Sequence, residues 1–593
     1  MSGGAADLAV AGLGTGAIAA LSGLGLIATY RLTGVLNVAF GAIGMLGAYL
    51  VRDLVRDAHL PEYAAGFIVV CCFAPLLGLA LEAAVFGPLQ AARADAGRLL
   101  TAGFGVAVLL VGIATAVWGG AARTDAPSLL PGGTLVIGGV SVAAALPIEL
   151  ALVLLVALGL AWFSRGGPTI RAVIDDRQLA ESAGLPARRL ARIGWVVGTM
   201  LATLTGVLLA PQLRFDPSTL TLVLFETLGV AIAAGLRSAP LAIVFAFGTA
   251  IAQAELTGVH LTGAAGSVLE AVRSNLFVVL LLLATWFTPA FSELPTSQPP
   301  ASRSRYLSAY ILVLVFAVFA WNLRTADLHA ALTIPALALV LLSFRVLHSA
   351  GMLSLGQAGL AGIGALAAGW ASGWGILGAP LAGAAVAIVF ALPVLRQAGL
   401  HLAIATLAAA TALSSFLFDQ PLFTPSSVAR PAFAQSDRGY LYFELCIVVI
   451  ALAVLTALVR GQGALRLSAI RDSEIAAGTV GIAVDRERLA VFAGAGALAA
   501  LGGALWAAGD QVFDPTAFAP TQGLIWFAAA AAVGFANPTA LFAAAIVLVV
   551  ADNYVAGASA IIVGVATIVL PWLRPETRWG AVMRRALDPR PQL

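Results

Sequence analysis

The chain has 593 residues, of which 61% are hydrophobic and only 10% are charged, and its formal net charge is +3. About a quarter of the residues in a soluble domain are charged, so this composition predicts a membrane protein and excludes an ordinary globular domain. The chain contains no lysine. Because a phosphate-binding P-loop needs a lysine after its glycine-rich turn, the chain is not expected to hydrolyse a nucleotide itself.

Long apolar segments follow one another along the whole chain. Residues 9–30, 67–86 and 275–291 are each long enough for a helix that crosses a hydrocarbon core of ~30 Å. A hydropathy criterion gives roughly 16 to 19 such segments. The sequence therefore predicts an all-α polytopic membrane protein.

Two basic loops interrupt the apolar segments. Residues 165–192 hold six arginines, and residues 460–488 hold five. Short basic loops stay in the cytoplasm, so both loops are predicted on that side. The loops with fewer basic residues would face outward: 122–133, 212–220, 418–440 and 509–520.

A Pro- and Ser-rich segment, ELPTSQPPASRSR at residues 293–305, lies between two apolar blocks of similar length. Its composition is typical of a linker. The sequence therefore predicts a first half at residues 1–292 and a second half at residues 306–593.

The two halves contain matching segments in the same order. LATLTGVLLA, which begins at residue 201, matches LAALGGALWA, which begins at residue 498, at six of ten positions. LNVAFGAIGMLGA, from residue 36, likewise resembles LSLGQAGLAGIGA, from residue 353. These matches indicate a tandem duplication. Because the matching basic loops lie on one side, we expect parallel repeats related by a pseudo-two-fold axis along the membrane normal.

The second basic loop contains a charged segment, IRDSEIAAGTVGIAVDRERLA at residues 470–490, between two apolar spans. Its pattern predicts a helix of about fifteen residues with a narrow apolar face and small alanines. Such a helix is either solvated, as the positive-inside rule allows, or docked on another surface. A matching copy in the first half favours a pair of docking surfaces.

The run EIAAGTVGI, at residues 474–482, resembles the EAA loop of ABC-transporter permeases, which contacts an ATP-hydrolysing subunit. In detail the chain is similar to permeases of the branched-chain (leucine/isoleucine/valine) amino-acid type. Residues 30–50 resemble the first permease of such systems, and residues 351–370 and 399–408 resemble the second. The resemblance covers nearly the whole chain. It implies that two permease subunits, which are usually separate proteins, are fused here.

The resemblance also implies which residues couple the chain to its ATPase partners. In the second loop they would be Glu474, Ala476, Ala477 and Gly481, and in the first loop Asp176, Arg177, Ala180 and Gly184. The first loop departs from the family pattern because Arg177 lies opposite Glu474. The first half is therefore expected to contact its ATPase differently.

A solute path needs a few polar groups near the middle of the membrane. The candidates lie in the Gly-rich repeated segments and one later span: Thr33, Asn37, Ser354, Gln357 and Thr406. Asn37 and Ser354 occupy equivalent positions of the repeat. These side chains could instead form hydrogen bonds within tightly packed helix interfaces. The histidines are scattered and no pair has metal-ligand spacing, so neither a metal site nor a catalytic site is expected.

The leading hypothesis is the permease subunit of an ABC importer for branched-chain or other small amino acids, in the bacterial plasma (inner) membrane. Its partners would be two ABC ATPase subunits, an extracytoplasmic solute-binding protein, the solute and the bilayer, with no nucleic acid. The chain would not be an enzyme and would need no cofactor, because the partner subunits bind ATP. The alternatives are an ABC permease for urea or short amides and an ion-coupled secondary transporter, for which Glu226 within a span is the main argument.

Overall fold

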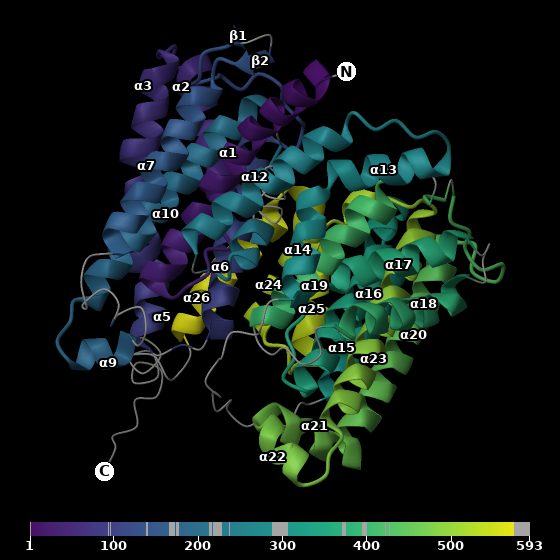
Figure 1. Cartoon of the computed structure of the whole chain (residues 1–593). Helices are drawn as coiled ribbons and strands as arrows, with labels where there is room; N and C mark the ends of the chain where they lie inside the picture. The colour runs from purple at the N-terminus through teal and green to yellow at the C-terminus, as the bar shows by residue number, and fades with distance from the viewer. Residues whose placement is uncertain are drawn as a thin grey trace. The chain divides into compact units, whose positions relative to one another are not determined.

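The computed structural model describes residues 2–92, 94, 96–137, 140–164, 172, 177–212, 216–217, 228–236, 238–287, 306–370, 375–393, 400–420, 423–425 and 427–573. The chain forms two compact units, Met1–Thr288 with Pro571–Leu593 and Pro289–Leu570, and each is described by itself (Figure 1). The predicted linker lies outside the described residues, so the predicted domain boundaries stay a prediction.

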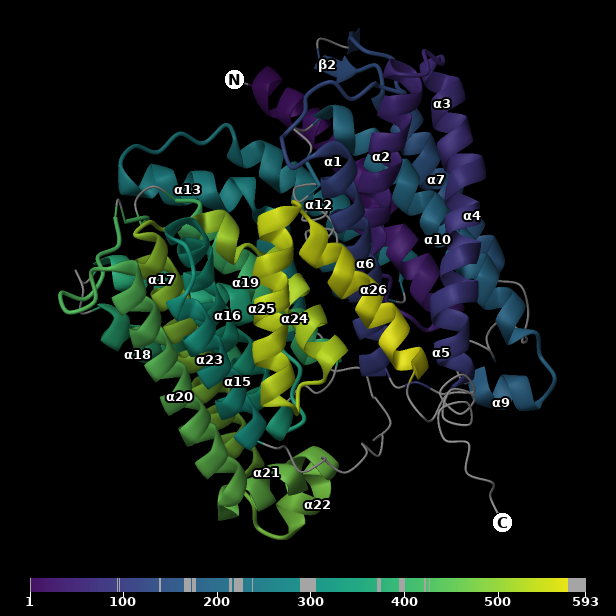
Figure 2. The same ribbon diagram turned by 180° about the vertical axis from the view of Figure 1, so that it is seen from behind.

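The first unit consists mainly of long helices that pack side by side (Figures 1 and 2). They are α1 (Ser2–Thr33), α2 (Phe40–Arg56), α6 (Ala96–Trp118), α7 (Leu146–Ser164), α10 (Ala187–Leu209) and α12 (Ala239–Leu256). One further span is continuous from Glu62 to Ala91 and contains α3 (Glu62–Ile68), η1 (Val69–Phe73), α4 (Ala74–Leu81), η2 (Glu82–Phe86) and α5 (Gly87–Ala91). The shorter helices are α9 (Arg177–Ser182), η3 (Ala210–Gln212), α13 (Ala264–Ser274) and α14 (Leu276–Phe287).

The first unit also contains a small β-hairpin, which the all-α prediction did not include. Strands β1 (Thr134–Ile137) and β2 (Val140–Ala143) pair antiparallel, and Thr134 lies opposite Ala143. β-Branched residues in TLVI and VSVA favour the extended conformation over a helix. The hairpin lies at the end of the first unit that is opposite to α9 (Figure 1).

The second unit is helical in its described residues. Its helices, in chain order, are α15 (Tyr306–Trp321), α16 (Thr325–Ser349), α17 (Gln357–Trp370), α18 (Gly375–Ala391), α19 (Leu400–Leu413), η4 (Ser414–Phe418), α20 (Asp437–Arg460), α21 (Gln462–Asp472), α22 (Glu474–Thr479), α23 (Val484–Asp510), η5 (Pro515–Phe518), α24 (Pro520–Val533), α25 (Pro538–Tyr554) and α26 (Ala558–Leu573). Helices α21 and α22 lie together at the end of α20 (Figures 1 and 2).

The described residues hold fewer full-length spans than the number of apolar segments in the sequence. Among the described residues, nine helices are long and apolar enough to cross a membrane, or ten if the bent pair of α13 and α14 counts as one span. The roughly 16 to 19 apolar segments expected by hydropathy include several that form helices of 10–17 residues. Such helices rise about 15–26 Å and do not cross ~30 Å of hydrocarbon by themselves.

The predicted duplication is confirmed by local backbone conformation as well as by sequence. Gly34 follows α1 with φ +70°, and Gly351 follows α16 with φ +71°. After the same number of residues, α2 begins at Phe40 and α17 begins at Gln357. Glycine adopts this left-handed conformation without steric cost, so it ends the incoming helix in both halves. Each half thus contains a helix, a short irregular segment and a second, shorter helix.

Small residues bring the same pair of helices into backbone contact in each half. A Cβ atom on Gly206 of α10 would overlap the carbonyl group of Gly44 on α2. In the second half, a Cβ atom on Gly503 of α23 would overlap the carbonyl group of Ala361 on α17. Helices in a membrane associate through such close packing, because lipid tails leave little hydrophobic driving force between them. The duplicated segments therefore form the same helix crossing twice.

We predict that Gly503→Val destabilises the second unit by about 1–3 kcal/mol, because the side chain must displace the backbone of α17. Gly494→Ala is the matched control. It lies on the same helix with nothing within 4 Å of the added Cβ, and it should leave stability unchanged or raise it by up to ~1 kcal/mol. Thermal unfolding of the purified full chain in detergent measures both. Equal melting temperatures for the two variants would contradict this account of the crossing.

Candidate functional site

The charged loop of the second half contains two short helices, where the sequence predicted one helix of about fifteen residues. Helix α21 ends at Asp472, and α22 begins at Glu474. Ser473 between them is extended, with φ −162° and ψ 112°, and its Oγ accepts a hydrogen bond from the amide of Ala476 at 3.2 Å. Serine at an N-cap starts a new helix in this way. The break turns α22 away from the direction of α21.

A left-handed glycine ends α22. Gly481 has φ +85°, and the amide of Ile482 donates to the carbonyl of Ala477 at 3.1 Å. This arrangement returns the chain toward α23, which begins at Val484. The side chain of Ala477 is buried under the turn, whereas Ala476 is exposed.

The first-half loop has the same geometry 297 positions earlier. Helix α9 has six residues, as α22 does. Ala180 is buried, Gly184 has φ +80°, and the amide of Leu185 donates to the carbonyl of Ala180 at 2.9 Å. Helix α10 then begins at Ala187. Asp176 and the side chain of Arg177 lie outside the described residues, so their predicted roles stay predictions.

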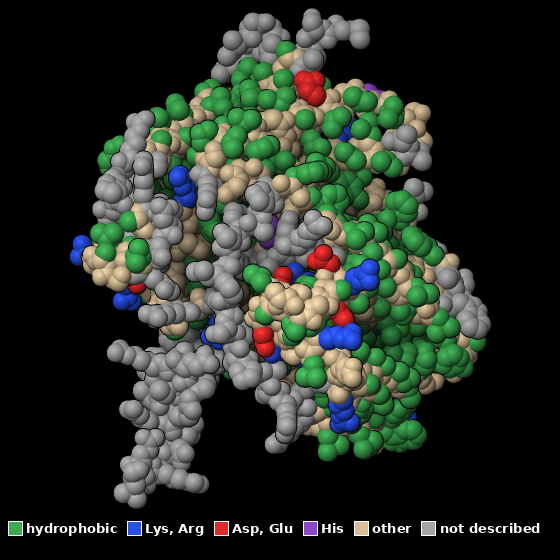
Figure 3. Space-filling model, turned by 60° about the horizontal axis from the view of Figure 1, so that its bottom comes forward, with side chains coloured by type: hydrophobic (Ala, Val, Ile, Leu, Met, Phe, Trp, Pro, Cys, Tyr) green, Lys and Arg blue, Asp and Glu red, His purple; other side chains and the backbone are tan. Residues whose placement is uncertain are grey.

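Both loop helices expose apolar side chains beside charged ones. Ile475 is 82% exposed, Val480 78% and Leu179 on α9 69%. Figure 3 shows the face that carries α21 and α22, where arginine and acidic side chains gather around the loop while hydrophobic side chains cover the neighbouring flank. Large exposed apolar side chains in a polar loop are typical of an interaction surface.

An ion pair fastens α22 to the spanning helix α23. Both Nη atoms of Arg488 donate to the carboxylate of Glu474. The distance is 2.8 Å from Nη2 to Oε1 and 3.0 Å from Nη1 to Oε2. The Arg488 side chain is 4% exposed, which reduces screening by water. In the first half, Arg177 and Ala191 stand at the positions of Glu474 and Arg488. Both members of the pair are thus replaced there by residues that cannot form it.

The same loop touches the irregular segment between α16 and α17. A Cβ atom on Gly351 would lie 2.9 Å from Cγ of Arg471 and 3.2 Å from its Cα. The sequence offered no sign of this contact, because 120 positions separate the two residues. It places the end of α21 directly against the start of the segment that holds Ser354.

Hydrogen bonds within the second unit engage its three predicted solute-path residues. Thr406 Oγ1 accepts from the amide of Leu355 at 2.9 Å, and Ser354 Oγ accepts from the amide of Gly356 at 3.2 Å. Gln357 Oε1 accepts from Ser343 Oγ at 2.9 Å. These bonds join the irregular segment to α19 and the first residue of α17 to α16.

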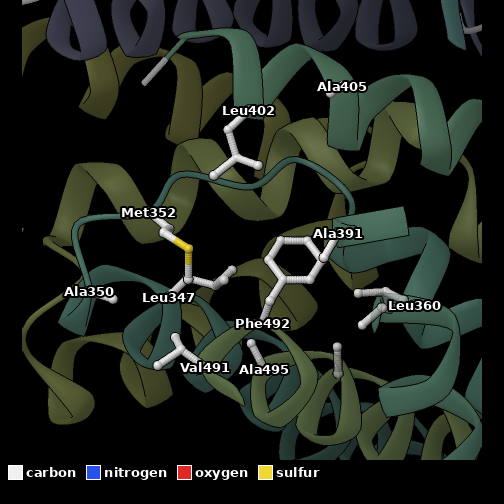
Figure 4. Packing of buried hydrophobic residues seen from close by; sticks show 12 residues of the cluster. Leu347, Ala350, Met352, Leu360, Ala391, Leu402, Ala405, Val491, Phe492 and Ala495 are labelled. Carbon is white, nitrogen blue, oxygen red and sulfur yellow. The ribbon is translucent and has the colours of Figure 1, made fainter. Parts of the chain in front are cut away.

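Apolar packing holds this segment against α23. Figure 4 shows the ring of Phe492 at the centre of a buried cluster. Met352 of the irregular segment, Leu347 of α16 and Leu402 of α19 lie around it. A movement of α23 would therefore displace the irregular segment through direct contact.

In the first half, the two predicted solute-path residues differ from each other in their hydrogen bonding. Thr33 Oγ1 donates to the carbonyl of Thr29 at 2.6 Å and accepts from the amide of Val35 at 3.0 Å, so it stabilises its own turn. Asn37 is 1% exposed, and neither Oδ1 nor Nδ2 has a hydrogen-bond partner among the described residues. Most buried polar groups are hydrogen-bonded, so Asn37 stands apart from the other four candidates.

Sequence reasoning missed one buried anchor in the predicted outward loop at residues 418–440. Arg430 Nε donates to the carbonyl of Ala508 at 3.2 Å, and its Nη1 lies 2.6 Å from Asp437 Oδ1. The arginine thus satisfies the last turn of α23 and ties it to the start of α20. One arginine among many carries no signal of burial in the sequence.

We predict that Arg488→Ala loosens α22 without unfolding the second unit. The variant removes both hydrogen bonds to Glu474, so hydrogen exchange in residues 474–482 should speed up by about tenfold or more, as expected for loss of a charge-assisted interaction of ~1.5–3 kcal/mol. Glu474→Ala should have the same local effect, and the double variant should add little, because one interaction is lost in all three. Additive effects of the two single changes would contradict the pair.

The branched-chain amino acid transport system / permease component family matches the chain twice, at residues 8–286 and 328–582. The high-affinity branched-chain amino acid transport system permease protein BraD of Pseudomonas aeruginosa is 26% identical over 294 residues, which are 46% of this chain and 92% of that relative. The corresponding LivH proteins of Salmonella typhimurium and Escherichia coli are each 26% identical over 214 residues, which are 33% of this chain and 68% of each relative.

One relative thus corresponds to about half of the chain, as the predicted fusion requires. The nine described spans and these relatives indicate a multi-pass protein of the inner membrane. The chain belongs to the branched-chain amino acid transport permease family, and it carries two copies of the family's permease unit in a single polypeptide.

Proposed function

We propose that this chain supplies both permease halves of an ABC importer for branched-chain or other small amino acids. Two ATPase subunits contact the loops that carry α9 and α22, and these subunits bind and hydrolyse the ATP. An extracytoplasmic solute-binding protein delivers the solute. The chain itself needs no cofactor and carries out no covalent chemistry.

The observation that carries the proposal is the repeated loop geometry. Helices α9 and α22 are equally long, and each contains one buried alanine. Four residues after that alanine, beyond the end of the helix, each loop has a glycine with φ near +80°. Such exposed helices are too polar to insert in the membrane. Two matching copies suit two copies of a partner, as an ATPase pair would provide.

Each loop is joined to a candidate solute segment by packed helices. In the second half, Arg488 links α22 to α23, and Gly503 of α23 contacts α17. In the first half, α9 leads into α10, whose Gly206 contacts α2. Because packed helices transmit displacement rather than absorb it, closure of the ATPase subunits would shift α2 and α17.

The solute class rests on the relatives, whose names state branched-chain amino acid transport. Urea or a short amide is the alternative solute, since Asn37 offers both a donor and an acceptor. An ion-coupled carrier would not need the duplicated loops, and Glu226, which supported it, lies outside the described residues.

We predict that Val480→Asp weakens association with the ATPase subunits by about tenfold or more, because it places a charge in an apolar contact. Leu179→Asp should act in the same way on the first loop. Co-purification of the ATPase subunits with the full chain measures the association. Glycine variants are less informative, because a side chain at φ +85° would strain the loop of Gly481 itself.

Val136→Asp is the matched control for Val480→Asp. Val136 is 73% exposed on β1, at the end of the first unit that is opposite to α9, so the same chemical change should leave ATPase association unaltered (Figure 1). ATPase binding that survives both Val480→Asp and Leu179→Asp would show that the docking surface lies elsewhere.

A further inference from the structure

We infer that the second unit binds one phospholipid in a groove between α15, α16 and α25, and that Asp327 selects a lipid whose headgroup carries a primary ammonium group.

The groove lies among three apolar helices of the second unit. Helices α15, α16 and α25 pack against one another (Figure 2) and leave a hollow of about 460 Å³ between them. This volume falls within the range of sites that bind small molecules. Asp327 and Ile334 both line the hollow and are seven residues apart, so it runs about 10 Å along α16.

Most of the groove is apolar and open along one side. Its walls include Leu312, Val315 and Phe319 of α15, and Ile546, Val549 and Val550 of α25. Val315 is 57% exposed, Phe319 62% and Val550 44%, so no described residue of the second unit covers them. Lipid tails are as apolar as these side chains, so an acyl chain suits the groove.

The polar residues of the groove gather at one end. Asp327 lies in the first turn of α16, and Asn553 and Tyr554 are the last residues of α25. The opposite end of α16 leads to the second basic loop, where Gly351 lies against Arg471. That loop is predicted in the cytoplasm, so the polar end of the groove faces the outer leaflet.

Aromatic side chains agree with a position of this end at the membrane surface. The candidate span that contains α16 begins at Asp327. Tyr554 is 80% exposed, and Trp321 at the end of α15 is 64% exposed. Tyrosine and tryptophan are enriched at the level of the lipid headgroups. Asp327 therefore lies beside the headgroups, and the apolar walls lie beside the acyl chains.

The carboxylate of Asp327 is available to a ligand. It is exposed, and it forms neither a hydrogen bond nor an ion pair among the described residues. The helix dipole favours a negative charge in the first turn of α16. A primary ammonium group supplies the opposite charge, and its N–H donors suit both Asp327 and the amide oxygen of Asn553.

An arginine beside the same end suits the other charge of a zwitterionic headgroup. Arg438 Nη2 donates to the carbonyl of Leu323 at 3.2 Å, and Leu323 lines the groove. Its remaining donors can bind a lipid phosphate. Phosphatidylethanolamine thus matches Asp327 with its ammonium group and Arg438 with its phosphate. Phosphatidylglycerol offers only the phosphate, and phosphatidylcholine has the positive charge without an N–H donor.

Native mass spectrometry of the delipidated full chain tests this selection, with the dioleoyl forms of these three lipids as probes. The wild type should bind phosphatidylethanolamine about two- to fivefold more tightly than either other lipid, as the strength of an exposed ion pair implies. Asp327→Asn should remove the preference, and Asp327→Lys should reverse it in favour of phosphatidylglycerol. Asp485→Asn is the control, because it makes the same chemical change at an exposed position in the first turn of α23.

A second pair of variants tests the groove itself. Val315→Trp fills it and should remove the single tight site for all three lipids. Val318→Trp is the matched control, because Val318 is 63% exposed on the same helix and does not line the groove. Both substitutions lie at exposed positions, so both variants should melt as the wild type does without lipid.

A preference for phosphatidylethanolamine that survives Asp327→Asn would overturn the inference. Equal binding of phosphatidylethanolamine and phosphatidylcholine, or equal lipid binding by the two tryptophan variants, would do the same. A dimer of the wild type that Val315→Trp dissociates would show that a second copy of the chain occupies the groove. None of these outcomes involves the ATPase loops, so the proposed function is tested separately.

Discussion

The close approach of two helices in each half is the constraint on which the rest of the structure depends. Gly206 lies against Gly44, and Gly503 lies against Ala361, at distances that leave no room for a larger side chain. These contacts fix how closely α2 approaches α10 and how closely α17 approaches α23. They also pack α10 and α23, which follow the basic loops, against α2 and α17. Without small residues at the crossings, the loops and the polar segments would have no rigid connection.

The two halves share this framework and differ in the polar groups placed on it. In the second half, the polar side chains bond within the protein. Glu474 pairs with Arg488, and Ser354 and Thr406 accept hydrogen bonds from the backbone before α17. The first half has no counterpart of the ion pair, and the side chain of Asn37 has no hydrogen-bond partner among the described residues. Duplication preserves the backbone because packing tolerates little change, whereas polar side chains at equivalent positions are free to diverge once the framework is stable.

Fusion of two permease units in one chain allows the two halves to carry different polar groups at equivalent positions. Two identical subunits would have to share every side chain, so a group that binds the solute would appear twice. Two halves of different sequence can differ at such positions, as Asn37 and Ser354 do.

The sequence alone predicted the membrane class, the duplication and the position of both basic loops, because these depend on composition and on order along the chain. The match of LATLTGVLLA with LAALGGALWA, for instance, marked the helices that later proved to cross α2 and α17. The short helices α21 and α22 were harder to predict from the sequence. Ser473 separates them within a segment whose composition suggested one continuous helix. Only the tertiary structure decided which polar residues have partners. Thr406 and Leu355 meet across 51 positions, and Arg471 and Gly351 across 120, and no local pattern encodes such contacts. Asn37 and Ser354 were equivalent in the sequence, and packing alone separated the unpartnered amide from the structural hydroxyl.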